Sequence, residues 1–213
     1  MKIAVFVSGG GTNLQAIIDK IASGEIRNVE IAEVIASNDR AFAIERAKKA
    51  GIPSKVISKK ALGENYDDAT LTELNSLGVD LVVLAGFLSM LGPKTVAAYA
   101  NRIINIHPAL IPAFCGQGMY GIRPHEAVLA KGVKVSGATV HFVNEHYDEG
   151  PIILQKAVDV LPDDTPESLQ QRIMKECEQV ILPKAIQLIA DGRIEVVNNL
   201  VRVKDEDSER KTL

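Results

Sequence analysis

The sequence contains no tryptophan and only two cysteines, and aromatic residues make up just 4% of its 213 positions. The cysteines, Cys115 and Cys177, stand far apart in the chain and form no Cys-x-x-Cys pair. Two isolated thiols fit a reducing compartment better than a disulfide-stabilised scaffold, and they provide no ligand-spaced set for zinc. We therefore expect a cytoplasmic protein that needs neither a disulfide nor a metal.

An excess of positive charge is also missing. The chain has 24 lysines and arginines against 27 acidic residues, a net charge of −3 and an isoelectric point near 5.8. Without a basic field we expect no nucleic acid partner and no anionic membrane partner. No apolar run reaches the roughly 18 residues of a membrane span, and glycines interrupt the apolar start of the chain too early for a signal peptide.

The distribution of apolar residues predicts the fold. The expected strands cover residues 2–7, 31–37, 53–57, 80–85, 102–106, 135–143 and 151–160, and the expected helices cover residues 12–22, 41–50, 66–76 and 165–190. Repeated β-then-α units predict a doubly wound, mostly parallel, Rossmann-like α/β sheet. The last two strands predict an antiparallel C-terminal extension, followed by a long C-terminal helix. We expect one domain over residues 1–200 and a charged, disordered tail over residues 201–213.

A glycine-rich segment, Ser-Gly-Gly-Gly-Thr-Asn at residues 8–13, links the first expected strand to the first expected helix. Glycines permit a sharp turn, and the free amides of a helix N-terminus favour an anion such as phosphate. A dinucleotide fingerprint starting at Gly9 would require glycine where Leu14 stands, and no Gly-Lys-Ser/Thr triplet forms a P-loop. A tight turn with no ligand is the alternative to a phosphate site.

Two polar residues, Asn105 and His107, interrupt the apolar strand Ile-Ile-Asn-Ile-His-Pro. Side chains two positions apart on a strand point to the same side, and a buried polar group left unpaired costs about 1–3 kcal/mol. Pro108 ends this strand at the edge where open α/β sheets bind ligands. A second polar cluster, residues 144–149, separates the two antiparallel strands. A satisfied structural histidine is the alternative, but the nearby cluster and glycine segment favour a functional site.

Six segments of the chain resemble, in order, the phosphoribosylglycinamide formyltransferase family, the folate-dependent enzymes of purine synthesis. They are SGGGTNLQAII, LAGFLSML, INIHPALIPAF, GATVHFV, DEGPIILQ and KECEQVILP, and they cover nearly all of the chain up to about residue 200. Asn-x-His-Pro with a downstream Asp-x-Gly-Pro is the most specific part of the resemblance. The wider formyltetrahydrofolate-using superfamily shares the Asn, His and Asp, so these three indicate the chemistry better than the acceptor.

The resemblance implies transfer of the formyl group of 10-formyltetrahydrofolate, a co-substrate, to the amine of glycinamide ribonucleotide. Asn105 would donate a hydrogen bond to the oxyanion of the tetrahedral intermediate. His107 would donate a second bond and then act as general acid toward the departing folate nitrogen. Asp148 would hold His107 protonated, with a water between them as an alternative to direct contact. This chemistry requires no metal.

The resemblance also implies the binding residues. The backbone amides of Gly11, Thr12 and Asn13 would bind the substrate phosphate, and Lys175 and Glu178, three apart on a helix, would contact the phosphate and the ribose. The residues expected to bind the folate, in addition to Asn105, are Leu88, Ser89, Met90, Leu91, Asn144, Glu145, His146, Tyr147 and Asp148. The alternatives are a solvated charge pair for the helix residues and core packing for the apolar ones.

Several histidines and one cysteine receive no catalytic assignment from the sequence. We expect His141 to have a structural role, we assign no catalytic role to His125 or His146, and we treat Cys115 as a small loop residue. The loop after the His-Pro segment, FCGQGMYGIRPHEAV, departs from the family pattern.

A second departure concerns the folate tail. Many members carry an arginine just before the Tyr-Asp pair, whereas this chain has KKALGENYDDA. Lys59 or Lys60 is the candidate substitute, although lysine lacks the planar fork of arginine.

Other functions fit less well. A 10-formyltetrahydrofolate hydrolase is the nearest alternative, although such enzymes usually carry a preceding regulatory domain. A methionyl-tRNA formyltransferase would need an RNA-binding domain and a basic surface. A non-catalytic nucleotide-binding module and a nicotinamide oxidoreductase are further alternatives, and the broken dinucleotide fingerprint counts against the latter. The expected partners are the two small-molecule substrates, with the protein a monomer or a homodimer.

Overall fold

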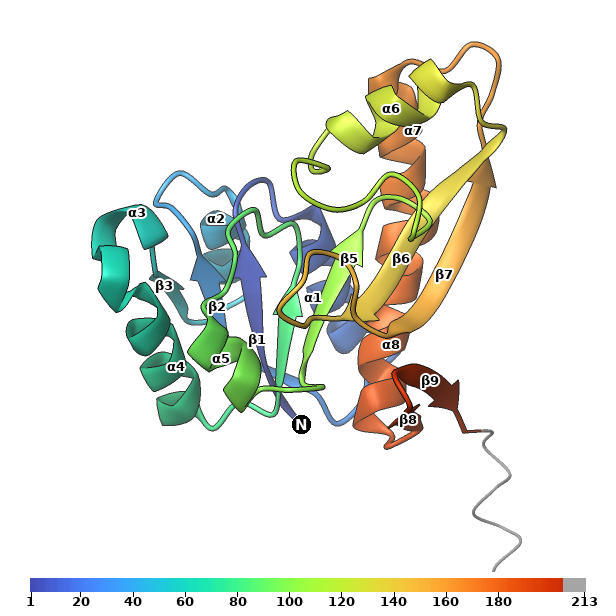
Figure 1. Ribbon diagram of the computed structural model, residues 1–213. Coiled ribbons are helices and arrows are strands. Elements are labelled where there is room, and N and C mark those ends of the chain that lie inside the picture. Colours follow the sequence, from blue (N-terminus) through green and yellow to red (C-terminus); the bar gives the residue numbers. More distant parts are fainter. Residues whose placement is uncertain (205–213) are drawn as a thin grey trace, which may run out of the picture.

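The computed structural model describes residues 1–204, and the rest of the predicted tail, residues 205–213, lies outside the described residues. Its main sheet contains β1 (Lys2–Val7), β2 (Glu30–Ala36), β3 (Ser54–Val56), β4 (Leu81–Leu84), β5 (Ile103–His107), β6 (Val135–Phe142) and β7 (Ile152–Asp159). The strands lie in the order β3-β2-β1-β4-β5-β6-β7, as Figure 1 shows. The first five strands in this order, from β3 at the edge to β5, run parallel to one another. Strand β6 pairs with β5, and β7 with β6, both in antiparallel fashion. The predicted doubly wound sheet with an antiparallel extension is confirmed.

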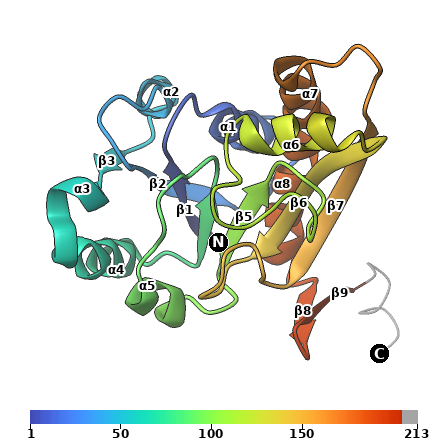
Figure 2. The same ribbon diagram turned by 45° about the horizontal axis from the view of Figure 1, so that its top comes forward.

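Helices cover both faces of this sheet (Figures 1 and 2). They are α1 (Thr12–Ala22), α2 (Ala43–Lys49), α3 (Lys59–Leu62), α4 (Tyr66–Leu77), α5 (Pro93–Ala98), α6 (Arg123–Lys131), α7 (Pro166–Ile173) and α8 (Gln179–Ala190). A short 3₁₀ turn, Gly63–Asn65, joins α3 to α4. Within residues 1–204, no helix combines the length and apolar character that a membrane span requires.

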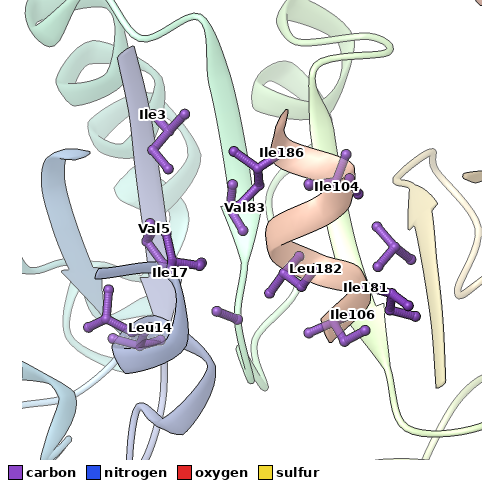
Figure 3. Close-up of a cluster of buried hydrophobic side chains, with 14 of the residues drawn as sticks. Ile3, Val5, Leu14, Ile17, Val83, Ile104, Ile106, Ile181, Leu182 and Ile186 are labelled. Atoms are coloured by element: carbon purple, nitrogen blue, oxygen red, sulfur yellow. The ribbon is translucent and has the colours of Figure 1, made fainter. Parts of the chain in front are cut away.

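The larger hydrophobic core lies between one face of the sheet and helices α1 and α8 (Figure 3). Alternate strand residues point into it, among them Ile3 and Val5 of β1 and Ile104 of β5, and they meet Leu182 and Ile186 of α8. All five side chains are completely buried. This face therefore follows the period-two pattern of a sheet with one side in a core.

The opposite face of the sheet is divided into an apolar half and a polar half. Helix α4 and the segment around α5 pack against Phe6 of β1 and Val82 of β4, together with Ile103. Asn105 and His107 share the parity of Ile103 and therefore point to this second face. Opposite them in the antiparallel pair stand His141 and Thr139 of β6. Polar side chains thus occupy the part of this face that lies beyond the apolar packing of α4 and α5.

The predicted long helix over residues 165–190 is confirmed. It begins with Thr165 and Ser168 forming a reciprocal capping box, and a π-helical turn, Met174–Glu178, lies within it between α7 and α8. Such π-helical turns insert extra backbone into a helix and often occur at functional sites. Here the turn contains the buried Glu178.

Three helices, α3, α5 and α6, were not predicted, nor was a terminal hairpin of β8 (Ile194–Val197) and β9 (Leu200–Val203). The three helices are short, with four, six and nine residues, so they carry too few turns for a clear apolar periodicity. The hairpin crosses the boundary predicted at residue 200. A tail starting at residue 201 is therefore wrong for residues 201–203.

The packing of α8 generates a stability prediction. Leu182→Ala removes a fully buried side chain and should lower the free energy of unfolding by about 2–5 kcal/mol. Val180→Ala on the same helix is the matched control, because Val180 is 46% exposed, and it should change stability by less than about 0.5 kcal/mol. Urea denaturation of both variants measures the difference, and similar losses in the two would place Leu182 outside the core.

Candidate active site

A cavity of about 870 Å³ opens beside the carboxyl ends of β1, β4 and β5. Its wall consists of residues 9–13, 84–91, 105–108, 116–121 and 143–148, with further side chains from α5, α6, β6 and the late helix. This volume is typical of a small-molecule site. The predicted site residues other than Lys175 all line this one cavity.

His107 lies at the centre of this wall and is 3% exposed. Its Nε2 is 2.9 Å from the carbonyl oxygen of Phe114, so Nε2 carries a hydrogen and donates a hydrogen bond to that oxygen. Its Nδ1 is 3.6 Å from Oδ2 of Asp148, a close contact that is longer than a direct hydrogen bond. His107 is thus held from both sides by the two loops that follow β5 and β6.

Asp148 joins these two loops. Its Oδ2 accepts a 2.8 Å hydrogen bond from the Gly116 amide, and its Oδ1 lies 3.5 Å from Nε2 of His141. The backbone of Asp148 is left-handed, with φ of 56°. Such a conformation is uncommon outside glycine and persists only where the surroundings hold it. Gly150, next to this loop, cannot carry a side chain, because a Cβ there would lie 1.8 Å from the Phe142 carbonyl oxygen.

His141, for which we expected a structural role, is part of the same cluster. Its Nδ1 donates to the carbonyl oxygen of Phe142 at 2.7 Å, so in the neutral ring Nε2 is an acceptor. Nδ2 of Asn105 lies 3.2 Å from that Nε2 and donates to it. His141 therefore fixes the orientation of the Asn105 amide and leaves the second N–H of Asn105 for another partner.

The protonation of His107 differs from the prediction. Burial lowers the pKa of His107, and the negative charge of Asp148 opposes this shift without reversing it. The ring is therefore neutral at pH 7, although Asp148 favours the cation. Burial pushes the pKa of Asp148 upward, but contacts with His141, the Gly116 amide and His107 bring it below its usual value. Asp148 is thus an ionised partner of a neutral histidine.

The glycine segment adopts the predicted strand–turn–helix arrangement. Gly11, at the start of α1, has a φ of 71°, and a Cβ there would come within 2.6 Å of Ala43. Arg46 of α2 donates from Nε to the Gly10 carbonyl at 2.7 Å and from Nη1 to Gln15 at 3.1 Å. These contacts fix the turn, and the residues at the start of α1 line the cavity. A helix N-terminus in that position suits an anion.

The π-helical turn brings Glu178 to this segment. The buried Glu178 carboxylate accepts a 2.7 Å hydrogen bond from Nδ2 of Asn13, and burial raises the pKa of Glu178. Lys175 is separated from it, because Lys175 lines a neighbouring groove between α1 and α8 together with Thr12. The structure thus brings Glu178 to the cavity and leaves Lys175 at its border.

The predicted folate-binding residues form two walls. Leu88 and Met90 are 59% and 38% exposed, so they are not core residues, whereas Leu91 is buried in the core of α4 and α5. The loop of residues 144–148 lines the same cavity. Lys59 and Lys60 lie on α3, away from the residues that line the cavity.

Among the lining residues that the sequence analysis did not assign to the site are Arg123 and His125, both on α6. The Arg123 guanidinium lies 4.8 Å from the ring centre of Tyr120. The segment that carries them departs from the family pattern, so no motif pointed to either residue.

In the part of the chain that the structure describes, no group of three potential ligands is arranged for a metal ion.

Known proteins resemble this chain over nearly its whole length. Residues 1–186 match the formyl transferase family. A phosphoribosylglycinamide formyltransferase of Haemophilus influenzae is 42% identical over 201 residues, which cover 93% of this chain and 92% of that protein. A chloroplastic relative of that name from Arabidopsis thaliana is also 42% identical, and the chain spans 66% of its length.

Solved structures give the same picture. Glycinamide ribonucleotide transformylase 1 from Symbiobacterium toebii has a TM-score of 0.90 and 43% identity, with 96% of this chain and 94% of that chain covered. A formyltetrahydrofolate deformylase from Pseudomonas syringae has a TM-score of 0.86 but only 27% identity. The alignment covers 96% of this chain and 66% of the deformylase.

The contact between Asp148 and His107 generates a prediction for the pKa of His107. Asp148→Asn should lower this pKa further, because the carboxylate opposes the effect of burial. An NMR titration of the histidine ring protons measures the shift. Glu149→Gln is the matched control, since it neutralises the exposed neighbouring acid and should leave the pKa of His107 unchanged. An unchanged pKa in Asp148→Asn would show that the two side chains are not coupled.

Proposed function

The chain belongs to the formyl transferase family, and from this membership and the geometry of the cavity we propose the reaction, the donor and the roles of the residues. The activity is that of a phosphoribosylglycinamide formyltransferase, which transfers a formyl group to N1-(5-phospho-D-ribosyl)glycinamide in purine biosynthesis. We propose 10-formyltetrahydrofolate as the donor. The observation that carries the mechanism is the convergence of Asn105, His107 and Asp148 on one cavity wall.

The reaction begins with attack of the acceptor's neutral amine on the formyl carbon. A new carbon–nitrogen bond forms, and the formyl oxygen becomes an oxyanion. The second N–H of Asn105 donates to this oxygen, because His141 accepts the first. An oriented donor of this kind is typically worth about 2.7–4 kcal/mol in the transition state.

His107 manages the proton that the amine must lose. Its ring is neutral at rest with Nδ1 unprotonated, so Nδ1 accepts that proton, and the neighbouring Asp148 carboxylate stabilises the resulting cation. The cation then gives a proton to the folate nitrogen, the oxyanion re-forms the carbonyl, and the original carbon–nitrogen bond breaks, which releases the folate and regenerates the neutral ring. To donate toward the substrate, Nε2–H of His107 must exchange its bond to the Phe114 carbonyl for one to the substrate. Donor binding therefore includes a local adjustment of the loop after β5.

We propose that both substrates occupy the cavity at the same time. The amides of Gly11, Thr12 and Asn13 would bind the acceptor phosphate, and Glu178, oriented by Asn13, would accept from a ribose hydroxyl. Lys175, on the border groove, would contribute charge at longer range. The exposed apolar side chains of Leu88 and Met90 and the polar loop 144–148 would hold the pterin between them. The formyl carbon would then lie between these regions, at His107.

The experiment for this function measures folate release from 10-formyltetrahydrofolate, with and without the ribotide. We expect release only when N1-(5-phospho-D-ribosyl)glycinamide is present. Equal release without the ribotide would instead establish the hydrolase named for the more distant structural relative. No release in either reaction would refute both enzymes.

Variants of the central residues test their roles. His107→Asn and Asp148→Asn should lower kcat by orders of magnitude, and Asn105→Ala by about 10²–10³-fold, because each removes an interaction formed in the transition state. Glu149→Gln, the matched control, should retain normal turnover. Steady-state kinetics with both substrates measures these effects, and near-normal kcat in His107→Asn or Asp148→Asn would refute the assigned roles.

A further inference from the structure

His125 is a buried histidine for which the mechanism so far has no use. It lies near the start of α6, beside Pro124, and its side chain is completely buried. It also forms part of the cavity wall. Figures 1 and 2 show α6 beside α7, near the carboxyl end of β5.

Neither ring nitrogen of His125 has a hydrogen-bond partner within the described residues 1–204. The other two buried histidines differ, since His107 and His141 each contact protein atoms through both nitrogens. A neutral imidazole carries one donor and one acceptor, and burying both without partners is unfavourable. Buried polar groups in folded proteins are paired in the great majority of cases. A group that enters the cavity is therefore the natural partner of His125.

The charge state of His125 limits what this partner is. Burial, with a smaller contribution from the charge of His107, lowers the pKa of His125 to about 4. At neutral pH the ring is therefore neutral, with one N–H and one free nitrogen. The best partner is an uncharged group that both accepts and donates a hydrogen bond, such as a secondary amide.

The acceptor substrate contains such a group close to its reacting amine. In glycinamide ribonucleotide a single methylene carbon separates the amine from the amide carbonyl. The amine must meet the formyl carbon at His107, and the cavity that His107 and His125 both line also reaches Gln170 and Glu178 of the late helix. Resting on the proposed function, we propose that His125 hydrogen-bonds the amide of the acceptor and thereby directs its amine toward the formyl carbon.

Kinetics of His125→Phe and His125→Gln test this proposal in the full-length enzyme. Phenylalanine fills the space but removes both polar atoms, so kcat/KM for the ribotide should fall by about 10- to 100-fold. KM for the formyl donor should stay within about twofold, because His125 is assigned to the acceptor. Glutamine keeps a donor and an acceptor and should recover part of the loss. The melting temperature of His125→Phe should equal or exceed that of wild type, since unpaired buried groups are removed.

Ser136→Ala is the matched control. The Ser136 hydroxyl is also buried and unpaired within the described chain, but it lies on β6 and does not line the cavity. This variant should leave kcat/KM for the ribotide unchanged. An unchanged value in His125→Phe, or an equal loss toward both substrates, would overturn the proposal. A lower melting temperature in both His125 variants would assign the residue to the fold and also overturn it. Failure of the wild-type enzyme to transfer the formyl group would refute the proposed function itself.

Discussion

The contact of Asp148 with two histidines and one backbone amide is the interaction on which the site depends. It joins the loop after β5, through Gly116, to the loop after β6. It also keeps a carboxylate beside His107 and His141, where burial alone would favour neutral groups. The left-handed backbone of Asp148 and the close approach at Gly150 are the conformational cost of this placement. Such strain is common where a side chain must be held for chemistry.

The sheet explains why the polar residues occur together. Strand β5 directs Ile104 into the core of α1 and α8, and it directs Asn105 and His107 to the other face. The antiparallel partner β6 does the same, which brings His141 opposite Asn105. On that face α4 and α5 pack over the preceding strands, so the polar half is left for loops and ligand. The buried strand β5 therefore contains an amide and an imidazole because both side chains lie on the face that lines the cavity.

Much of this arrangement was predictable from the sequence. Apolar runs predicted the strands, and the Asn-x-His-Pro and Asp-x-Gly-Pro segments indicated the central residues. The π-helical turn was not predictable, because its sequence has the same apolar pattern as a continuous helix. The neutral state of His107 depends on burial, which no motif reports. His125 received no role from the sequence because its importance lies in the lack of hydrogen-bond partners for its ring, which only the folded structure reveals.

The central claim is that one cavity holds both substrates, with their reacting atoms at Asn105 and His107. A crystal structure with the ribotide and a folate that lacks the formyl group tests it most directly. We expect the phosphate within hydrogen-bond distance of the amides of residues 11–13, and the folate nitrogen that carries the formyl group facing His107. A phosphate seated in the groove of Arg46 and Lys175, or a folate outside the wall formed by residues 88–91, would refute the claim.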